Sequence, residues 1–229
     1  MITGIIGAMS METDALKGLV KDSQRETVSG IEFVKGTIGG QDVVVAQCGI
    51  GKVFAALCAQ TMILRYGVKQ VVNTGVAGGL SEELHLLDIA ISTAVVQHDM
   101  DTSPLGDPVG MISGINRVEL PACPRLAHEI ARAADALGKK CQLGVIASGD
   151  QFIADPRRKE ELIRRFGAIA CEMEGAAVGH VCYVNGVDFV IVRAISDHAS
   201  EEAGQLEYPE LCRRAAEDSQ RLIQAFFAS

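Results

Sequence analysis

Three acidic residues of this 229-residue chain stand at the ends of short apolar segments. Glu12 comes after ITGIIGAM, Glu174 after AIACEM, and Asp197 after FVIVRAIS. Each segment has the length and the β-branched content of a strand buried in a parallel sheet. Because such sheets bind ligands beyond the carboxyl ends of their strands, we expect the three carboxylates to share one pocket.

This set of carboxylates suits the cleavage of a glycosidic bond. That reaction passes through a sugar cation, so it needs an acid for the leaving group, a base for water and negative charge beside the sugar. The alternative is that each carboxylate only caps or begins the helix after its strand, where the helix dipole favours negative charge. Three such residues after three buried strands favour the catalytic interpretation.

Strands and helices alternate along the sequence, which predicts an α/β fold with one domain over 1–229, a central mixed sheet and helices on both sides. Strands are predicted to end near residues 7, 39, 48, 74, 96, 147, 173 and 196, with a hairpin turn at Gly39-Gly40. Helices are predicted over 12–21, 52–66, 124–137, from 155–156 onward, 174–184 and 208–227. The stretch 101–120 has no periodicity and predicts a long loop.

Two glycine segments, Gly49-Ile50-Gly51 and 75–79, match neither a phosphate-binding loop nor a dinucleotide motif. They allow two interpretations. The glycines form tight turns between strands and helices, or they let the backbone approach a flat ligand closely.

Composition excludes several classes of partner. The net charge of −8 argues against nucleic acid, which requires clustered Lys and Arg. No apolar segment approaches the roughly 20 residues that span a bilayer, and no basic leader opens the chain, so we expect a cytoplasmic protein with a small-molecule substrate and no membrane contact. The seven cysteines form no CxxC pair, and four lie in apolar segments typical of reduced core residues, namely Cys48, Cys58, Cys171 and Cys182.

The segment His98-Asp99-Met100-Asp101 contains residue types that bind metals, but its spacing on a loop is weak evidence. A hydrogen-bond network at an interface, or one that braces the loop, is the alternative. The expected chemistry needs no Lewis acid, so we expect neither a metal nor a cofactor.

Six motifs occur in an order that points to one known family. They are GIIGAM with Glu12, Gly49-Ile50-Gly51-Lys52, Asn73-Thr74-Gly75 with Ala77-Gly78-Gly79, Ser148-Gly149-Asp150, Cys171-Glu172-Met173-Glu174, and Arg193-Ala194-Ile195-Ser196-Asp197. Over nearly the whole chain this set resembles the bacterial 5′-methylthioadenosine/S-adenosylhomocysteine nucleosidases of the purine nucleoside phosphorylase superfamily. The resemblance implies that water cleaves the N-glycosidic bond of either nucleoside and releases adenine.

The resemblance also implies roles for the matching residues. Asp197 is expected to protonate adenine N7, Glu12 to orient the attacking water, and Glu174 to bind the ribose hydroxyls and stabilise the cationic transition state. The remaining residues expected around the substrate are Met9 and Ile50 at the 5′-thio group, Val76, Gly78 and Ser196 along the site, Phe152 stacked on adenine, the Ile153 backbone at the ring edge, Met173 and Glu172 near the ribose, Arg193 beside a carboxylate, and Tyr208 on the 5′ side. An ordinary structural salt bridge is an equal alternative for Arg193.

Departures from the family pattern leave the substrate open. Val76 stands where many relatives carry Ser, and Tyr208 stands where relatives often have Phe. Hydrolysis of futalosine or aminodeoxyfutalosine in menaquinone synthesis is the enzymatic alternative. Phosphorolysis is disfavoured because residues 8–12 offer no cation for phosphate, and Glu12 repels it. The three retained carboxylates argue against a non-catalytic nucleoside-binding protein.

The loop 101–120 predicts self-association. It carries Leu105, Val109, Met111 and Ile112, which a monomer would expose. The corresponding loop in the family contacts the neighbouring subunit's pocket. We therefore expect a homodimer in which each loop completes the other pocket.

Overall fold

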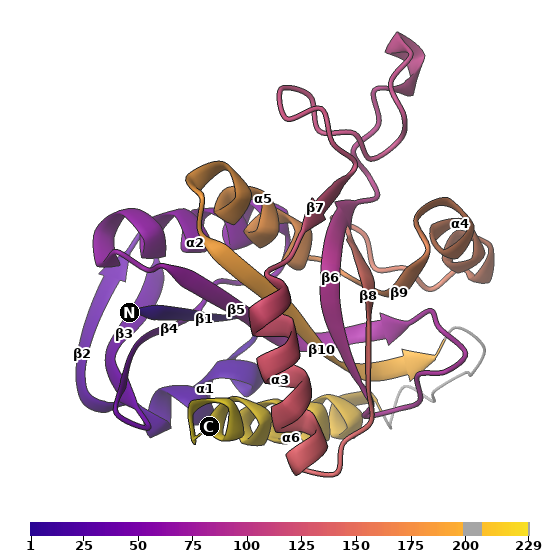
Figure 1. Ribbon diagram of the computed structural model, residues 1–229. Helices are drawn as coiled ribbons and strands as arrows, with labels where there is room; N and C mark the ends of the chain where they lie inside the picture. Colours follow the sequence, from indigo (N-terminus) through magenta and orange to yellow (C-terminus); the bar gives the residue numbers. More distant parts are fainter. Residues whose placement is uncertain (199–207, 229) are drawn as a thin grey trace.

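One mixed β-sheet runs through the centre of the molecule (Figure 1). The computed structural model describes residues 1–198 and 208–228, and of residues 198, 208 and 209 it describes only the backbone. Within these residues the sheet has ten strands: β1 (Thr3–Gly7), β2 (Lys21–Val28), β3 (Ile31–Ile38), β4 (Gln41–Gln47), β5 (Gln70–Gly79), β6 (Ile89–Gln97), β7 (Glu119–Pro121), β8 (Cys141–Ser148), β9 (Ala168–Glu172) and β10 (Asp188–His198).

The strand order brings distant carboxyl ends of strands together. The order is β10-β6-β8-β9-β5-β1-β4-β3-β2, and β5 also pairs with β10, so five of the strands close into a ring. Strand β1 is parallel to β4 and β5, and β5 is parallel to β10. The carboxyl ends of β1, β5 and β10 therefore lie at one edge of the sheet.

Helices cover the sheet on both sides, which confirms the predicted α/β architecture (Figure 1). The helices are α1 (Ser10–Leu19), α2 (Lys52–Tyr66), α3 (Pro124–Ala136), α4 (Pro156–Phe166), α5 (Gly175–Asn185) and α6 (Tyr208–Ala228). Helices α2 and α5 pack together on one side, and α1 and α3 pack with α6 on the other. Each side has its own apolar core, built mainly from Val, Ile, Leu and Ala. None of the described helices is long and apolar enough to cross a membrane.

Near the N-terminus the structure differs from the prediction in two elements. Strand β2 was not predicted, because it is a polar edge strand with mostly exposed side chains and so shows no apolar alternation. Helix α1 begins at Ser10 rather than at residue 12 and ends at Leu19, before the polar stretch that forms β2.

The glycine segment 75–79 continues strand β5 instead of forming a turn. A Cβ atom on Gly75 would lie 2.8 Å from Glu12 Oε1, and one on Gly78 would lie 3.2 Å from Asp197 Oδ2. The two glycines therefore leave room for pocket carboxylates that a side chain at either position would have to displace, and Gly78 itself lines the pocket.

The stretch 101–120 is mostly loop, as predicted, and it projects away from the sheet (Figure 1). It contains a single 3₁₀ turn, η1 (Ser103–Leu105), and an isolated bridge between Ile112 and Arg117 before β7 begins. Of the four apolar residues that were expected to be exposed in this loop, only Leu105 is, at 83%. Val109 and Met111 are half-buried, and the expectation is wrong for Ile112, which packs into the core beside the sheet.

Candidate active site

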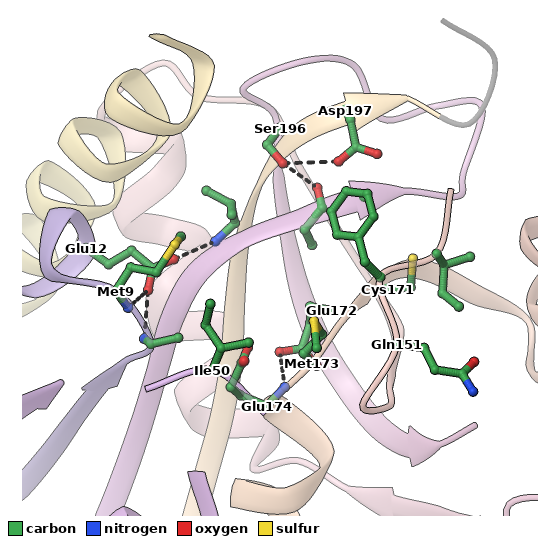
Figure 2. Close-up of a pocket in the computed structure, with 16 residues that line it drawn as sticks. Met9, Glu12, Ile50, Gln151, Cys171, Glu172, Met173, Glu174, Ser196 and Asp197 are labelled. Atoms are coloured by element: carbon green, nitrogen blue, oxygen red, sulfur yellow. Dashed lines mark hydrogen bonds between the residues drawn. The ribbon is translucent and has the colours of Figure 1, made fainter. Parts of the chain in front are cut away.

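A pocket lies at the carboxyl ends of β1, β5 and β10 and brings together most of the residues predicted for the site (Figure 2). The space between its lining residues, counted together with the open mouth, is about 680 Å³. The predicted residues that line it are Met9, Glu12, Ile50, Val76, Gly78, Phe152, Ile153, Glu172, Met173, Glu174, Ser196 and Asp197. Arg193 lies behind the wall, and the side chain of Tyr208 is outside the described residues.

The Glu12 carboxylate is buried at one side of the pocket. Its Oε2 accepts hydrogen bonds from the backbone N–H groups of Ala8 at 2.7 Å and Met9 at 2.9 Å, and its Oε1 accepts one from Val76 at 3.3 Å. Burial raises the pKa of Glu12, while these bonds and the charge of Arg193 partly oppose the shift. The bonds to Ala8 and Met9 also serve the start of α1, so the helix-start interpretation and the pocket interpretation both hold for this residue.

Glu174 occupies the N-cap position of α5, but its side chain makes no capping bond. Its Oε1 instead accepts a hydrogen bond of 2.8 Å from the backbone N–H of Gly51, across the pocket wall. Burial, reinforced by the nearby charge of Glu172, raises the pKa of Glu174 to about 7. This carboxyl group is therefore poised to change its charge near neutral pH.

Glu172 does the capping that the sequence suggested for Glu174. Its carboxylate accepts hydrogen bonds from the N–H groups of Glu174 and Gly175 at the start of α5, and from the Ser148 hydroxyl. It also forms an ion pair with Arg193, and both side chains are 2% exposed. Burial opposes ionisation of Glu172, but the Arg193 charge and these hydrogen bonds outweigh it and lower the pKa.

Arg193 connects the carboxylates from behind the pocket. Besides Glu172, its guanidinium donates to the Asn73 side chain at 2.6 Å and to the Asn73 carbonyl at 3.2 Å. Its Nη2 lies 4.0 Å from Glu174 Oε2. Arg193 therefore fits both interpretations. It forms a structural ion pair with Glu172, and its positive charge also lies close to the pocket carboxylate of Glu174.

Asp197 lies across the pocket from Glu12 and Glu174 (Figure 2). The pairing of β10 with β5 shifts register between Ile195 and Asp197, which sets Asp197 opposite Gly78. Irregularities of this kind re-aim a side chain. The Ser196 hydroxyl lies 3.2 Å from Asp197 Oδ1, and the ammonium group of Lys159 lies 3.5 Å from Oδ2. Unlike the two glutamates, Asp197 belongs to a strand and starts no helix.

The mouth and walls of the pocket are largely apolar. Phe152 is 67% exposed and Ile50 is 57% exposed, so both present hydrophobic surface at the opening. Met9 and Met173 line the interior, and Ile153 is buried. A flat ring with an apolar substituent suits these surroundings.

Sequence reasoning missed some residues at the site. Gln151, Ala8 and Ala77 line the pocket, as does Cys171, which was assigned to the core. All seven cysteines are free, and the four assigned to apolar segments are buried. Burial raises the pKa of the Cys171 thiol to about 12, so it stays neutral. Lys159 was also missed, although its helical spacing from Leu162 and Phe166 places it on the buried face of α4.

In the segment 98–101, Asp99 takes part in contacts that brace the loop. Asp99 forms an ion pair of 2.6 Å with Lys52 and accepts a hydrogen bond of 2.9 Å from the Asp150 N–H. Asp150 in turn accepts a hydrogen bond of 2.8 Å from the Lys52 N–H. These contacts connect the loop before α2, which carries Ile50, to the loop that carries Phe152. Among the described residues no group of three His, Cys, Asp or Glu side chains could hold a metal ion.

Comparison with known proteins identifies the protein family to which the chain belongs. The profile of the family described as the phosphorylase superfamily matches residues 2–228. The 5′-methylthioadenosine/S-adenosylhomocysteine nucleosidase of Shewanella sp. (strain MR-7) is 40% identical over 205 residues, which cover 89% of this chain and 86% of the relative. The chain belongs to the phosphorylase superfamily and, within it, to the family of these nucleosidases.

Solved structures agree with this assignment. The nucleosidase of Neisseria meningitidis, solved in complex with methylthio-immucillin-A, superposes with a TM-score of 0.93 at 29% identity, covering 99% of this chain and 98% of that one. A Helicobacter pylori structure described as futalosine hydrolase superposes with a TM-score of 0.91 at 34% identity, covering 98% of this chain and 96% of that one.

Proposed function

We propose that this protein hydrolyses the N-glycosidic bond of 5′-methylthioadenosine and S-adenosylhomocysteine and releases adenine. The observation that carries the proposal is the convergence of Glu12, Glu174 and Asp197 on one largely apolar pocket. The names of the relatives support the choice of substrates.

The carboxylates divide the chemistry between two sides of the bound nucleoside. Asp197 donates a proton to N7 of the departing base, so that the base leaves without full negative charge. Glu12 accepts a proton from the attacking water, and the upward shift of its pKa strengthens it as a base. Glu174 binds the ribose hydroxyls, and its anion stabilises the positive charge that develops on the sugar.

The walls of the pocket position the nucleoside so that its base and sugar face these carboxylates. Phe152 stacks on the adenine, and the Ile153 backbone contacts the edge of the ring. Met173 packs against the ribose, and Met9 and Ile50 form the apolar surface for the 5′-thio group. Glu172 acts indirectly, because its oxygens already accept bonds from Ser148, Arg193 and the start of α5.

Water is the proposed nucleophile because the pocket repels phosphate. Glu12 and Glu174 both face the space beside the ribose, and the Arg193 charge nearby is already engaged by Glu172. A phosphate dianion would meet unfavourable charge from both glutamates.

Futalosine-type nucleosides are a second candidate substrate class. The observation that favours them is the superposition on the Helicobacter pylori structure described as futalosine hydrolase. The reaction would be the same, with a different substituent at the 5′ side of the pocket.

We also propose a cytoplasmic homodimer built from one domain. The projecting loop 101–120 exposes Leu105, and helix α2, which begins two residues after Ile50 of the pocket, exposes Val53, Phe54 and Leu57. A partner subunit would cover these apolar side chains and complete the 5′ side of the site. Seven free cysteines suit a reducing compartment.

The test is a panel of 5′-substituted nucleosides assayed for free base in phosphate-free buffer. The panel contains methylthioadenosine, S-adenosylhomocysteine, 5′-deoxyadenosine and aminodeoxyfutalosine. We expect adenine release without phosphate, fastest with the two thio-nucleosides. Turnover that requires added phosphate would contradict hydrolysis, and binding without release of the base would contradict enzymatic activity.

A further inference from the structure

Lys159 is a buried lysine on a strongly charged helix whose other charged residues are all more exposed. Helix α4 reads PRRKEELIRRF, and only Lys159, Leu162 and Phe166 among its residues are buried. Lys159 is 4% exposed. Because burying an ammonium group is unfavourable unless it is paired, a buried lysine at this position calls for a counter-charge.

Asp197 in the pocket supplies that counter-charge. The Lys159 ammonium lies 3.5 Å from Asp197 Oδ2, and the side chains are 5% and 19% exposed. The other oxygen, Oδ1, faces the Ser196 hydroxyl at 3.2 Å. Both oxygens therefore have a polar group beside them, which fixes the orientation of the carboxyl group.

This arrangement raises a question about the proposed reaction. If Asp197 protonates the departing base, it must hold a proton when the bond breaks, and each turnover uses up that proton. A proton source must therefore act together with Asp197. The Lys159 ammonium is a buried acid in direct contact with the same carboxylate.

We propose that Lys159 is a positioning residue that acts through Asp197, holding the carboxyl group in place and replacing the proton that Asp197 gives to the base. The inference rests on the proposed function. As the C–N bond breaks, its electron pair goes to the base, and the proton of the Asp197 carboxyl group bonds to the base nitrogen. An N–H bond of the Lys159 ammonium breaks and an O–H bond forms on Asp197, which leaves a neutral lysine until solvent returns a proton.

The breaking bond sets the direction of this transfer. The base becomes more basic as it gains electrons from the breaking bond, so the proton moves toward it as the reaction proceeds. Arginine could hold Asp197 equally well, but its guanidinium does not give up a proton in proteins.

The inference is tested by comparing how each variant turns over two substrates, one whose leaving group needs a proton and one whose leaving group does not. The variants are Lys159→Met, Lys159→Arg and, as a control that removes an exposed charge from the same helix, Arg157→Met. Each is assayed with methylthioadenosine and with the 4-nitrophenyl glycoside of 5-methylthioribose, whose leaving group needs no proton. Melting temperatures establish that each variant is folded.

We expect both Lys159 variants to lower kcat for methylthioadenosine by about 100-fold, the usual contribution of general acid catalysis, while kcat for the nitrophenyl glycoside stays near the wild-type value. The Arg157 variant should match the wild type on both substrates. An equal fall on both substrates would show a purely structural role and overturn the inference. Wild-type activity in Lys159→Arg would also overturn it, since charge alone would then suffice. Failure of the wild-type protein to release adenine would instead refute the proposed function.

Discussion

Glu174 should make the protein less stable at neutral pH than a neutral side chain at the same position would. Burial and the charge of Glu172 raise its pKa from the ordinary value of 4.5 to about 7 in the folded protein. Between these two pH values the unfolded chain has already released the proton that the folded chain still holds. The free energy of unfolding therefore falls as pH rises through this window. Glu174→Gln removes the titrating group and should abolish this loss.

The size of the effect follows from the two pKa values. At about 1.4 kcal/mol for each pH unit, the full difference has a ceiling of about 3 kcal/mol. Between pH 5 and pH 8 the free energy of unfolding of Glu174→Gln, relative to the wild type, should rise by about 2.5 kcal/mol. Most of the increase should occur below pH 7, because the folded wild-type protein ionises above it.

Urea unfolding of both proteins at half-unit intervals from pH 5 to pH 8 measures this difference directly. The protein concentration must be constant, because dimerisation would add a concentration-dependent contribution to stability. Glu160→Gln is the matched control, since it removes the same charge from an exposed position on α4. A difference between Glu174→Gln and the wild type that is flat with pH, or that falls as pH rises, would refute the electrostatic account of this residue.

Three further outcomes are expected. Asp197→Asn should lower kcat by about 10²- to 10⁴-fold while nucleoside affinity measured by calorimetry changes little, and near-normal turnover would remove Asp197 from the mechanism. Glu172→Gln should lower the free energy of unfolding by about 3 kcal/mol in urea titrations, because it leaves the buried Arg193 without its ion-pair partner. An unchanged midpoint would show that Asn73 alone holds the arginine. Leu105→Asp places a charge on the apolar projecting loop, and sedimentation should shift from dimer to monomer; a stable dimer would locate the interface elsewhere.

The three carboxylates could be predicted because their positions follow from local sequence and strand topology together. A short apolar segment identifies a buried strand, and a parallel arrangement sends the ends of several strands to one edge. What each carboxylate contacts could not be predicted in this way. Glu172 and Glu174 are two residues apart, and only the folded backbone shows that Glu172 caps α5 and binds Arg193 while Glu174 faces the pocket.

Other features could not be predicted because they depend on contacts with segments far away in the sequence. Strand β2 is recognisable only by its pairing with β3, since its own side chains are polar and exposed. The segment 75–79 allowed either a tight turn or close approach to a ligand. In the structure it stays in strand β5, makes room for Glu12 and Asp197, and lines the pocket with Gly78. Lys159 sits in a run of charged residues typical of a solvated helix, and only its spacing from Leu162 and Phe166 sets it apart.

The buried charges of the site do not balance, and the imbalance has a chemical use. Arg193 forms its close ion pair with Glu172, and its nearest approach to Glu174 is 4.0 Å. Glu12 and Glu174 are therefore only partly compensated, which is why burial raises the pKa of both. A sugar that becomes cationic between them supplies the missing positive charge at the moment of bond cleavage. The same electrostatics that destabilise the folded protein would then stabilise the transition state, so substitutions at Glu174 should change stability and activity in opposite directions.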